Sequence, residues 1–295
     1  MEFLFSVFTP TYNRANTIGR TYEYLCKQTL RSFEWIIVDD GSTDNTEEIV
    51  QKWINTNKIS IVYLKQENGG KHRAFNRAVQ IAKGEIFICL DSDDYYIETA
   101  LEIIYSYHLI HKDNPWIAGF SCNSLDLHGN LIGTSLPVDE LVVSHYNLYN
   151  SLSVKGDKGL IYYTRILKEY PFPEFENEFF VTEALVLNRI SLRYKICCIK
   201  RSLEIKDYQR DGLSSKYRHL CLRNPNSYAL YINERNYFNL SFTNYVINAA
   251  SYVRYSLFAG KSFRNIYKEA INRRWTFIIA CFLGILLYIK DKSRS

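Results

Sequence analysis

Three carboxylates stand within four positions at the end of an apolar run. The stretch is FICLDSDDYY, in which residues 87–90 lead directly into Asp91, Asp93 and Asp94. Asp and Ser are common in turns because their side chains bond the local backbone. A magnesium ion, however, is often held by one or two carboxylates together with substrate phosphates. The other polar clusters of the sequence are needed to distinguish a simple turn from a cation site.

Three further polar clusters follow apolar runs in the first 90 residues. They are TPTYNR at 9–14, DDGSTD at 39–44 and QENGGKHR at 66–73. The runs at 3–8, 34–40, 59–65 and 85–91 indicate strands, and helical patterns at 17–30, 41–54, 70–83 and 97–111 alternate with them. This alternation predicts an α/β protein with a Rossmann-like, mainly parallel sheet. The near-continuous apolar strands indicate helices on both faces.

Ligands of such sheets bind outside the carboxyl ends of the strands, so the four clusters should line one rim. Asp39 and Asp40 could accept N–H groups of a base or ribose hydroxyls. The stretch NGGK at 68–71 offers backbone N–H groups and a cation at a helix start, which is a place suited to phosphate. Asp91 and Asp93 would hold a metal that bridges phosphates. Together these groups indicate a nucleotide.

Motifs of other nucleotide-binding classes are absent from the chain. Neither G-x-G-x-x-G nor G-x-x-x-x-G-K-[ST] occurs, which argues against a dinucleotide-dependent dehydrogenase and against a P-loop kinase or ATPase. The seven cysteines are scattered without the spacing of a zinc site, which suggests reduced thiols in a cytosol. We also expect no secretory signal peptide, because the N-terminus lacks a basic segment before its short apolar run.

With its motifs in this order, the sequence resembles the family 2 glycosyltransferases, which have the A-type nucleotide-sugar fold. The resemblance extends over residues 5–191 and is closest to bacterial surface-polysaccharide transferases. It implies a glycosyltransferase domain at 1–222. Beyond this domain the residue pattern itself predicts a C-terminal helical region at 223–295, which would associate with a membrane or form oligomers. The segments that carry the resemblance are PTYNR (10–14), IIVDDGSTDNT (36–46), NGGKHRAFNRAV (68–79), KGE (83–85) and LDSDD (90–94).

The resemblance also implies a site. A divalent cation, Mn²⁺ or Mg²⁺, would be bound directly by Asp93 and also by Asp91, which faces either the ribose or the metal. For Lys71, a solvated lysine at a helix start remains the alternative to a diphosphate contact, and a loop at 207–217 would close over the donor. The residues that would contact the nucleotide are Pro10, Thr11, Tyr12, Arg14, Asp39, Asp40, Gly70, Lys71, Asp91 and Ser92, with Arg73 as a weaker candidate.

Inverting members of this family use a carboxylate as the general base for the acceptor hydroxyl. The matching region is ENEFFVTEALVLNRI at 176–190, where Glu183 fits the position of the base. Many members read Glu-Asp there, whereas Glu183 is followed by Ala184. Glu178 and Asp157 are therefore reserve candidates, and Glu183 has the alternative role of an acidic residue favoured by a helix dipole.

The implied activity is the transfer of a hexosyl or N-acetylhexosaminyl group from a UDP-sugar to a glycan. The expected acceptor is linked to polyprenyl diphosphate, in surface polysaccharide biosynthesis. Two other functions stay open. One is a non-catalytic membrane scaffold that binds nucleotide-sugar. The other is a sugar nucleotidyltransferase, although residues 9–14 contain no glycine for its expected glycine-rich first loop.

The C-terminal segment is rich in basic residues and contains one long apolar stretch. Residues 254–295 contain nine Lys and Arg against two acids, although the whole chain has a net charge of only +5. Within them, 275–289 has Thr276 as its one polar side chain. As a helix this stretch is about 22 Å long, shorter than the ~30 Å core of a bilayer.

Three placements of this segment remain open: a buried helix at a domain or dimer interface, a helix lying in the membrane surface, or a span. We expect peripheral contact through 254–295 with the inner face of the cell membrane, in a cytoplasmic protein. No binding of nucleic acid is expected, because base-reading motifs do not accompany the basic run.

Overall fold

The computed structural model describes residues 3–207, 217–271 and 277–293. The chain forms two compact units. The first combines Met1–Phe172 with Val186–Arg210, and the second combines Pro173–Leu185 with Asp211–Ser295. The second unit therefore takes in a short stretch near 180 as well as the whole C-terminal region.

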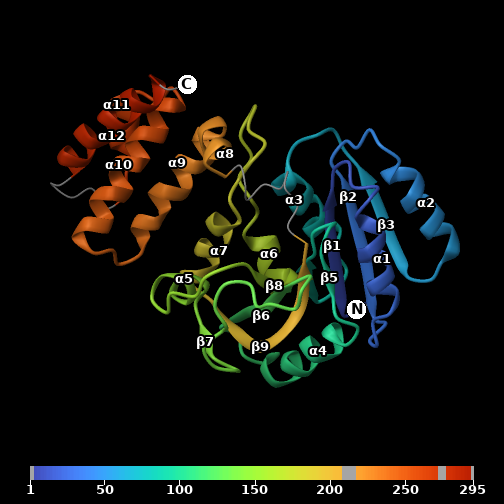
Figure 1. Cartoon of the computed structure of the whole chain (residues 1–295). Helices are drawn as coiled ribbons and strands as arrows, with labels where there is room; N and C mark the ends of the chain where they lie inside the picture. Colours follow the sequence, from blue (N-terminus) through green and yellow to red (C-terminus); the bar gives the residue numbers. More distant parts are fainter. Residues whose placement is uncertain (1–2, 208–216, 272–276, 294–295) are drawn as a thin grey trace. The chain divides into compact units, whose positions relative to one another are not determined.

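The first unit alternates strands and helices as the sequence predicts (Figure 1). Its elements are β1 (Phe5–Thr11), α1 (Ile18–Cys26), β2 (Phe33–Asp39), α2 (Thr46–Thr56), β3 (Ser60–Lys65), α3 (Lys71–Ile81), β4 (Ile86–Cys89), β5 (Tyr95–Tyr96), α4 (Ala100–His111), β6 (Ile117–Asp126), β7 (Val142–Val143), α5 (His145–Asn150), β8 (Lys158–Tyr163), α6 (Thr164–Glu169) and β9 (Lys195–Lys206). Helix α7 (Glu183–Ser191) begins in the second unit and ends in the first.

One mixed sheet contains all nine strands, in the order β3-β2-β1-β4-β8-β6-β9-β5, with β7 paired to β9. The pairs among β3, β2, β1 and β4 are parallel, as is the pair β6–β9. Strand β8 runs antiparallel to both β4 and β6. The α/β class and the largely parallel sheet are thus confirmed. Strands β1 and β2 are buried along almost their whole length, as strands covered on both faces should be.

This topology brings distant segments to one edge of the sheet. The carboxyl ends of β1, β2 and β4 lie at the same edge because these strands are parallel. Since β8 opposes β4 and β6, its first residues lie at that edge together with the end of β6. Strand β9 follows β6 in parallel, so Lys206 at its end also belongs to this rim.

A buried polar contact fixes β4 against β1 and β2. Glu34, which is buried, accepts hydrogen bonds from Ser6 Oγ at 2.6 Å and from the N–H of Lys83 at 2.7 Å. The N–H of Gly84 donates to Ser6 Oγ at 2.8 Å. A methyl group at Gly84 would lie 2.3 Å from the carbonyl carbon of Phe5. The chain therefore needs a glycine where it enters β4.

The second unit is helical. Its core forms where α10 packs against α9 and α12, and α10 and α12 lie side by side in Figure 1. A methyl group at Gly284 would lie 2.6 Å from the carbonyl oxygen of Ala250, so α12 approaches α10 closely on this side. Its helical elements are α8 (Tyr217–Arg223), α9 (Pro225–Glu234), η2 (Arg235–Tyr237), α10 (Phe242–Phe258), α11 (Phe263–Glu269) and α12 (Phe277–Lys292).

The small residues Ala280 and Gly284 are buried, whereas large apolar side chains of α12 are exposed. No helix in the described parts of the chain is both long and apolar enough to cross a membrane. Trp275 and Thr276, at the start of the predicted apolar segment, lie outside the described residues. We call the exposed side chains the apolar face of α12: Ile278, Ile279, Phe282, Leu283, Leu286, Leu287 and Ile289.

Two glycine-to-alanine changes test the entry into β4. We predict that Gly84→Ala lowers the free energy of unfolding by about 1–3 kcal/mol, because its methyl group meets backbone atoms of β1. Gly19→Ala is the matched control. Gly19 is exposed in α1 and a methyl group there would meet nothing within 4 Å. This change should therefore raise the free energy of unfolding by about 0.5–1 kcal/mol. Denaturant titration measures the free energy of unfolding of both variants. A Gly84→Ala protein as stable as the wild type would contradict the close packing described at Gly84.

Candidate active site

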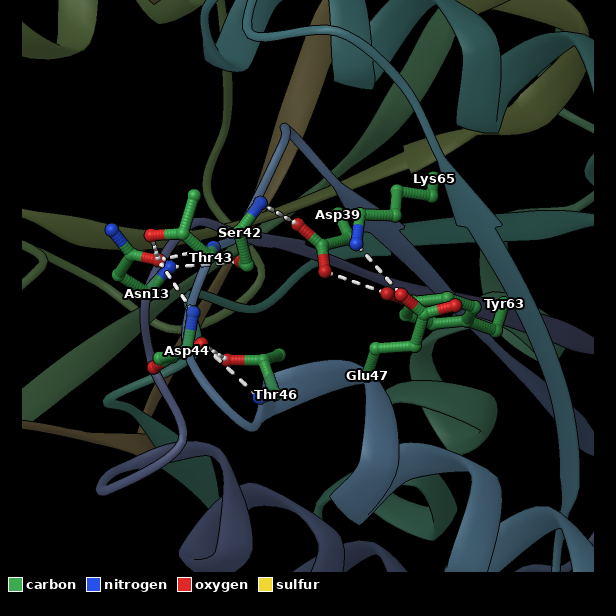
Figure 2. A network of polar contacts seen from close by, with 9 residues as sticks. All are labelled: Asn13, Asp39, Ser42, Thr43, Asp44, Thr46, Glu47, Tyr63 and Lys65. Atoms are coloured by element: carbon green, nitrogen blue, oxygen red, sulfur yellow. Dashed lines mark hydrogen bonds and ion pairs between the residues drawn. The ribbon is translucent and has the colours of Figure 1, made fainter.

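Asn13 ties the loop after β1 to the loop after β2 (Figure 2). Its Oδ1 atom accepts hydrogen bonds from the N–H groups of Thr43 at 2.8 Å and Asp44 at 3.3 Å. Its own N–H donates to Ser42 Oγ at 2.9 Å. Asn13 has a φ of 53°, in the left-handed region that asparagine tolerates better than most residues. The two loops of the rim are thereby fixed to each other.

Asp44 completes this connection at the start of α2. It accepts a hydrogen bond from the N–H of Ala15 at 3.0 Å. Figure 2 shows its two hydrogen bonds from Thr46, at 3.1 Å from the N–H and 2.6 Å from the hydroxyl. Burial alone would raise the pKa of Asp44, but the hydrogen bonds from Thr46 and Ala15 outweigh it and lower this pKa. Asp44 therefore stays ionised and holds the turn.

Asp39 is completely buried and supports the turn that carries Asp40. One carboxylate oxygen accepts from the N–H of Ser42 at 2.7 Å, and the other from the hydroxyl of Tyr63 at 2.6 Å (Figure 2). Burial and the adjacent Asp39 raise the pKa of the Tyr63 phenol, so this hydroxyl remains a donor. Both carboxylate oxygens of Asp39, which was predicted to contact the nucleotide, are thus used to hold the turn in this structure.

Asp40 binds the glycine loop that precedes α3. Its carboxylate accepts hydrogen bonds from the N–H groups of Gly69 at 2.8 Å and Gly70 at 2.7 Å, and from Gln66 Nε2 at 2.8 Å. The backbone donors assigned to phosphate from the sequence are thus directed to Asp40 in this structure. A carboxylate offers about four acceptor positions, so Asp40 retains one for a ligand.

The remaining nucleotide candidates surround this turn. The hydroxyl of Thr11 is buried and has no hydrogen-bond partner among the described residues. Tyr12 is 48% exposed and offers an aromatic face for a base. Arg14 is half-buried and its N–H donates to Thr46 Oγ1 at 3.2 Å. Pro10 is half-buried, Ser92 is buried, and Nη1 of Arg73 donates to the carbonyl of Gly69.

Lys71 and Asp91 form an ion pair of 2.7 Å between Nζ and Oδ1. Lys71 begins α3, directly after Gly70. Burial alone would raise the pKa of Asp91, but the charges of Lys71 and Lys206 outweigh it and lower this pKa. The residue predicted to bind phosphate, Lys71, is thus paired with a residue predicted to bind the metal ion, Asp91. Lys71 is accordingly more than a solvated helix-start lysine.

Asp93 has the environment of an anion that lacks a counter-ion. It forms no ion pair with any described residue, and burial together with the negative charge of Asp91 raises its pKa. Such a carboxylate gains most from a divalent cation, and a half-buried position leaves room for other ligands. The donor set therefore fits a magnesium or manganese ion.

The protein side of this site is sparse. The described residues contain no group of three or more His, Cys, Asp or Glu side chains placed to hold a metal ion. A site of two carboxylates completed by substrate phosphates and waters does not require such a group. Asp91 and Asp93 would accordingly hold the ion only together with a phosphate-bearing ligand.

The three base candidates differ in their surroundings. Glu178 is buried and accepts hydrogen bonds from the N–H groups of Asn226 at 2.7 Å and Ser227 at 2.8 Å, so it caps the start of α9. Asp157 is exposed in the loop before β8. Glu183 is half-buried and begins α7. Glu178 is thus engaged in a structural contact, whereas Glu183 lies at a helix start as predicted. Of the donor-closing loop at 207–217, residues 208–216 lie outside the described residues.

Three residues of the rim were not among the predicted site residues. Asn13 lies inside the PTYNR motif, and its tolerance of left-handed backbone is a signal that could have singled it out. Gln66 binds Asp40, and Lys206 binds Asp94 at 3.0 Å. For Lys206 the sequence holds no signal, because its position depends on which strands pair.

The motifs and the rim they form have a counterpart in a known family. Residues 6–125 match the sequence model of glycosyl transferase family 2. These residues form a glycosyltransferase family 2 domain. The resemblance inferred from the motifs is therefore confirmed for this part of the chain, and a sugar nucleotidyltransferase is disfavoured.

Curated relatives of the chain are named as bacterial glycosyltransferases. Glycosyltransferase GlyG of Streptococcus pneumoniae is 35% identical over 149 residues, which cover 48% of each chain. Poly(ribitol-phosphate) beta-N-acetylglucosaminyltransferase TarS of Staphylococcus aureus is 32% identical over 200 residues, which cover 64% of this chain and 34% of TarS. The chain thus spans about half or less of the length of these relatives.

Solved structures share the A-type fold beyond the matched domain. TarS residues 1–349 in complex with UDP-GlcNAc superpose with a TM-score of 0.63 at 20% identity, covering 98% of this chain and 91% of that one. Mannosyltransferase PcManGT of Pyrobaculum calidifontis, with GDP-Man and Mn²⁺, superposes with a TM-score of 0.56 at 16% identity over 98% and 88% of the two chains. At these identities the likeness concerns the fold.

The raised pKa of Asp93 has a consequence for stability. Because its folded pKa lies above the ordinary 3.8, ionisation of Asp93 disfavours the folded state as the pH rises through these two values. We predict that Asp93→Asn raises the melting temperature at pH 7 in metal-free buffer. The gain should shrink as the pH falls toward 3.8.

The control is Asp126→Asn. Hydrogen bonds from Asn130, and then from His128, lower the pKa of Asp126, so its ionised form favours the folded state and its replacement should not raise the melting temperature. Thermal denaturation of both variants at several pH values makes the comparison. Equal behaviour of the two would contradict the environment described for Asp93.

Proposed function

We propose that this protein is an inverting, metal-dependent glycosyltransferase. It moves a sugar from a nucleotide-sugar to a glycan acceptor in the synthesis of a bacterial surface polysaccharide. The observation that supports this most is the rim of the sheet, where the family 2 motifs bring Asp93, the ion pair of Lys71 with Asp91 and the polar loops after β1 and β2 to one edge. The confirmed family of residues 6–125 supports the reaction class.

The donor would lie across the loops joined by Asn13 and Asp40. Tyr12 would pack against the base, while the remaining acceptor position of Asp40 takes a base N–H. Asp91 would contact the ribose or the metal. Lys71 would leave its ion pair with Asp91 and bind the diphosphate. A UDP-sugar is the proposed donor because the solved TarS structure, which shares the fold, contains UDP-GlcNAc. The transferred group would be a hexosyl or N-acetylhexosaminyl unit.

Asp93 and Asp91 would hold Mn²⁺ or Mg²⁺. Such an ion supplies positive charge where the leaving nucleoside diphosphate gains negative charge. Lys71 supplies a second cation at the same place, from the start of α3. The chain thereby stabilises the leaving group without needing a proton donor for it.

Glu183 would act as the general base that takes the proton of the acceptor hydroxyl. The position of Glu183 at the start of α7 supports this role, because a helix N-terminus favours the ionised form that a base requires. Of the reserve candidates, Glu178 is engaged in capping α9. Asp157 remains the second choice, since it is exposed in the first unit.

Replacing the base separates binding from turnover. We predict that Glu183→Gln lowers sugar transfer by about 10²–10⁴-fold, the usual contribution of positioned proton transfer. Binding of the donor should stay within a few-fold of the wild type. The measurement is release of UDP from UDP-GlcNAc and related donors, alongside titration calorimetry with the same donors.

The matched control is Asp157→Asn, which should keep full transfer. If Asp157→Asn abolishes transfer and Glu183→Gln does not, the base is Asp157. A wild-type protein that binds donors but neither transfers nor hydrolyses them with any tested acceptor would instead indicate the non-catalytic scaffold.

The C-terminal unit would bring the enzyme to the inner face of the cell membrane, where a polyprenyl-diphosphate-linked acceptor is presented. The apolar face of α12 supports this, because its seven large side chains are exposed while the small residues pack on α10. Lys290 and Lys292 follow in the last turn, where anionic headgroups would attract them. We propose that α12 lies in the membrane surface with this face in the lipid.

Two substitutions on this face test the membrane contact. We predict that Phe282→Ser/Leu286→Ser weakens binding to anionic phosphatidylglycerol vesicles by at least about 10-fold. Burying each of these apolar side chains in lipid would contribute about 1.5–3 kcal/mol to the free energy of binding. Co-sedimentation with the vesicles measures the binding.

The matched control is Leu109→Ser/Ile110→Ser, which replaces two exposed apolar residues of α4 in the first unit and should leave vesicle binding unchanged. If the double change on α12 converts a dimer into a monomer in light scattering and leaves vesicle binding unaltered, the face is a homodimer interface instead.

A further inference from the structure

The third carboxylate of the DSDD turn is held by a buried lysine. Nζ of Lys206 lies 3.0 Å from Oδ2 of Asp94 and 3.3 Å from Oε1 of Glu204. The side chains of Lys206, Asp94 and Glu204 are 13%, 6% and 2% exposed, so water hardly screens these charges. Ser124 Oγ donates to the other oxygen of Glu204 at 2.7 Å.

Sheet pairing determines that these residues meet. Strand β5 follows Asp94 directly and runs antiparallel to β9, with Tyr95 opposite Ile205. The N–H of Asp207 also donates to Oδ1 of Asp94 at 3.0 Å, and Thr21 Oγ1 donates to the carbonyl of Asp94 at 2.9 Å. Both oxygens of the Asp94 carboxylate are therefore occupied by β9 and the residue after it.

The three acids of the turn consequently have three different environments. Asp91 is paired with Lys71, and Asp94 with Lys206. Asp93 forms no ion pair with any described residue. By formal charge, the four carboxylates and two ammonium groups of this cluster leave an excess of negative charge. Burial raises the pKa of Asp94 to about 7, and the charge of Arg14 acts to lower the pKa values of Asp91 and Asp93.

We propose that Lys206 is a positioning residue of the metal site: by holding Asp94 against the end of β9 it keeps Asp94 out of the ion's coordination and fixes the turn so that Asp91 and Asp93 meet the cation. This inference rests on the proposed metal-dependent function. Lys206 does not touch the ion or the donor itself.

The sign of the effect on metal binding distinguishes this role from two simpler ones. By Coulomb's law alone, removing a positive charge near a cation site strengthens cation binding. A purely structural ion pair would change the stability of the fold and leave the affinity of the folded protein for metal unaltered. The positioning role predicts weaker binding. Without Lys206, the buried carboxylates of Asp94 and Glu204 keep hydrogen-bond donors but lose their counter-ion, so the turn that carries Asp91 and Asp93 must repack.

The experiment measures Mn²⁺ binding to the full chain in the presence of saturating UDP. Electron paramagnetic resonance reports free Mn²⁺, at a temperature where each variant is folded by circular dichroism. We expect Lys206→Met to weaken Mn²⁺ binding at least about 10-fold and Lys206→Arg, which keeps the charge and donors, to recover part of the loss. Lys200→Met is the control on the same strand, since Lys200 is exposed and its ammonium donates to the carbonyl of Pro137 at 3.1 Å and to no carboxylate among the described residues.

Unchanged or tighter Mn²⁺ binding by Lys206→Met overturns the proposal. Wild-type protein that binds no Mn²⁺ at all contradicts the proposed metal-dependent function instead. If Lys206→Met does not fold, a crystal structure of the wild type with UDP and Mn²⁺ decides. The proposal requires Lys206 to remain on Asp94 with Asp94 away from the ion, and coordination of the ion by Asp94 refutes it.

Discussion

Repulsion between like charges is the constraint on which the site depends. The chain places Asp91, Asp93 and Asp94 within four positions, at the partly buried end of a strand where their ionised forms repel one another. The fold places the three acids in different environments. Lys71 compensates Asp91 and Lys206 compensates Asp94, so that the negative charge is concentrated on Asp93. A cation and a diphosphate would complete the balance.

The same sheet that buries these strands also supplies their partners. Lys71 comes from the start of α3, and Lys206 from β9, more than a hundred residues further along the chain. At the neighbouring strand ends, Asp39 and Asn13 hold the turn after β2, and Asp40 holds the glycine loop. The acids of the rim thus divide into those that shape loops and those left for a ligand.

Much of this arrangement follows from local sequence. Apolar strands that end in polar clusters predicted the parallel half of the sheet and the common rim, because parallel strands carry their ends to one edge. Lys206 and the capping role of Glu178 could not be predicted. Lys206 meets Asp94 only because β9 pairs with β5, and Glu178 caps a helix that begins nearly 50 residues later. Such contacts depend on tertiary pairing rather than on spacing.

Calorimetric titration of UDP into the protein, with Mn²⁺ and then with EDTA, tests the central claim most directly. The account predicts that binding is at least about 10-fold tighter with Mn²⁺, because Asp93 and the diphosphate share the ion. Equal affinity in the two buffers would show that no cation links Asp93 to the donor, and would contradict the account.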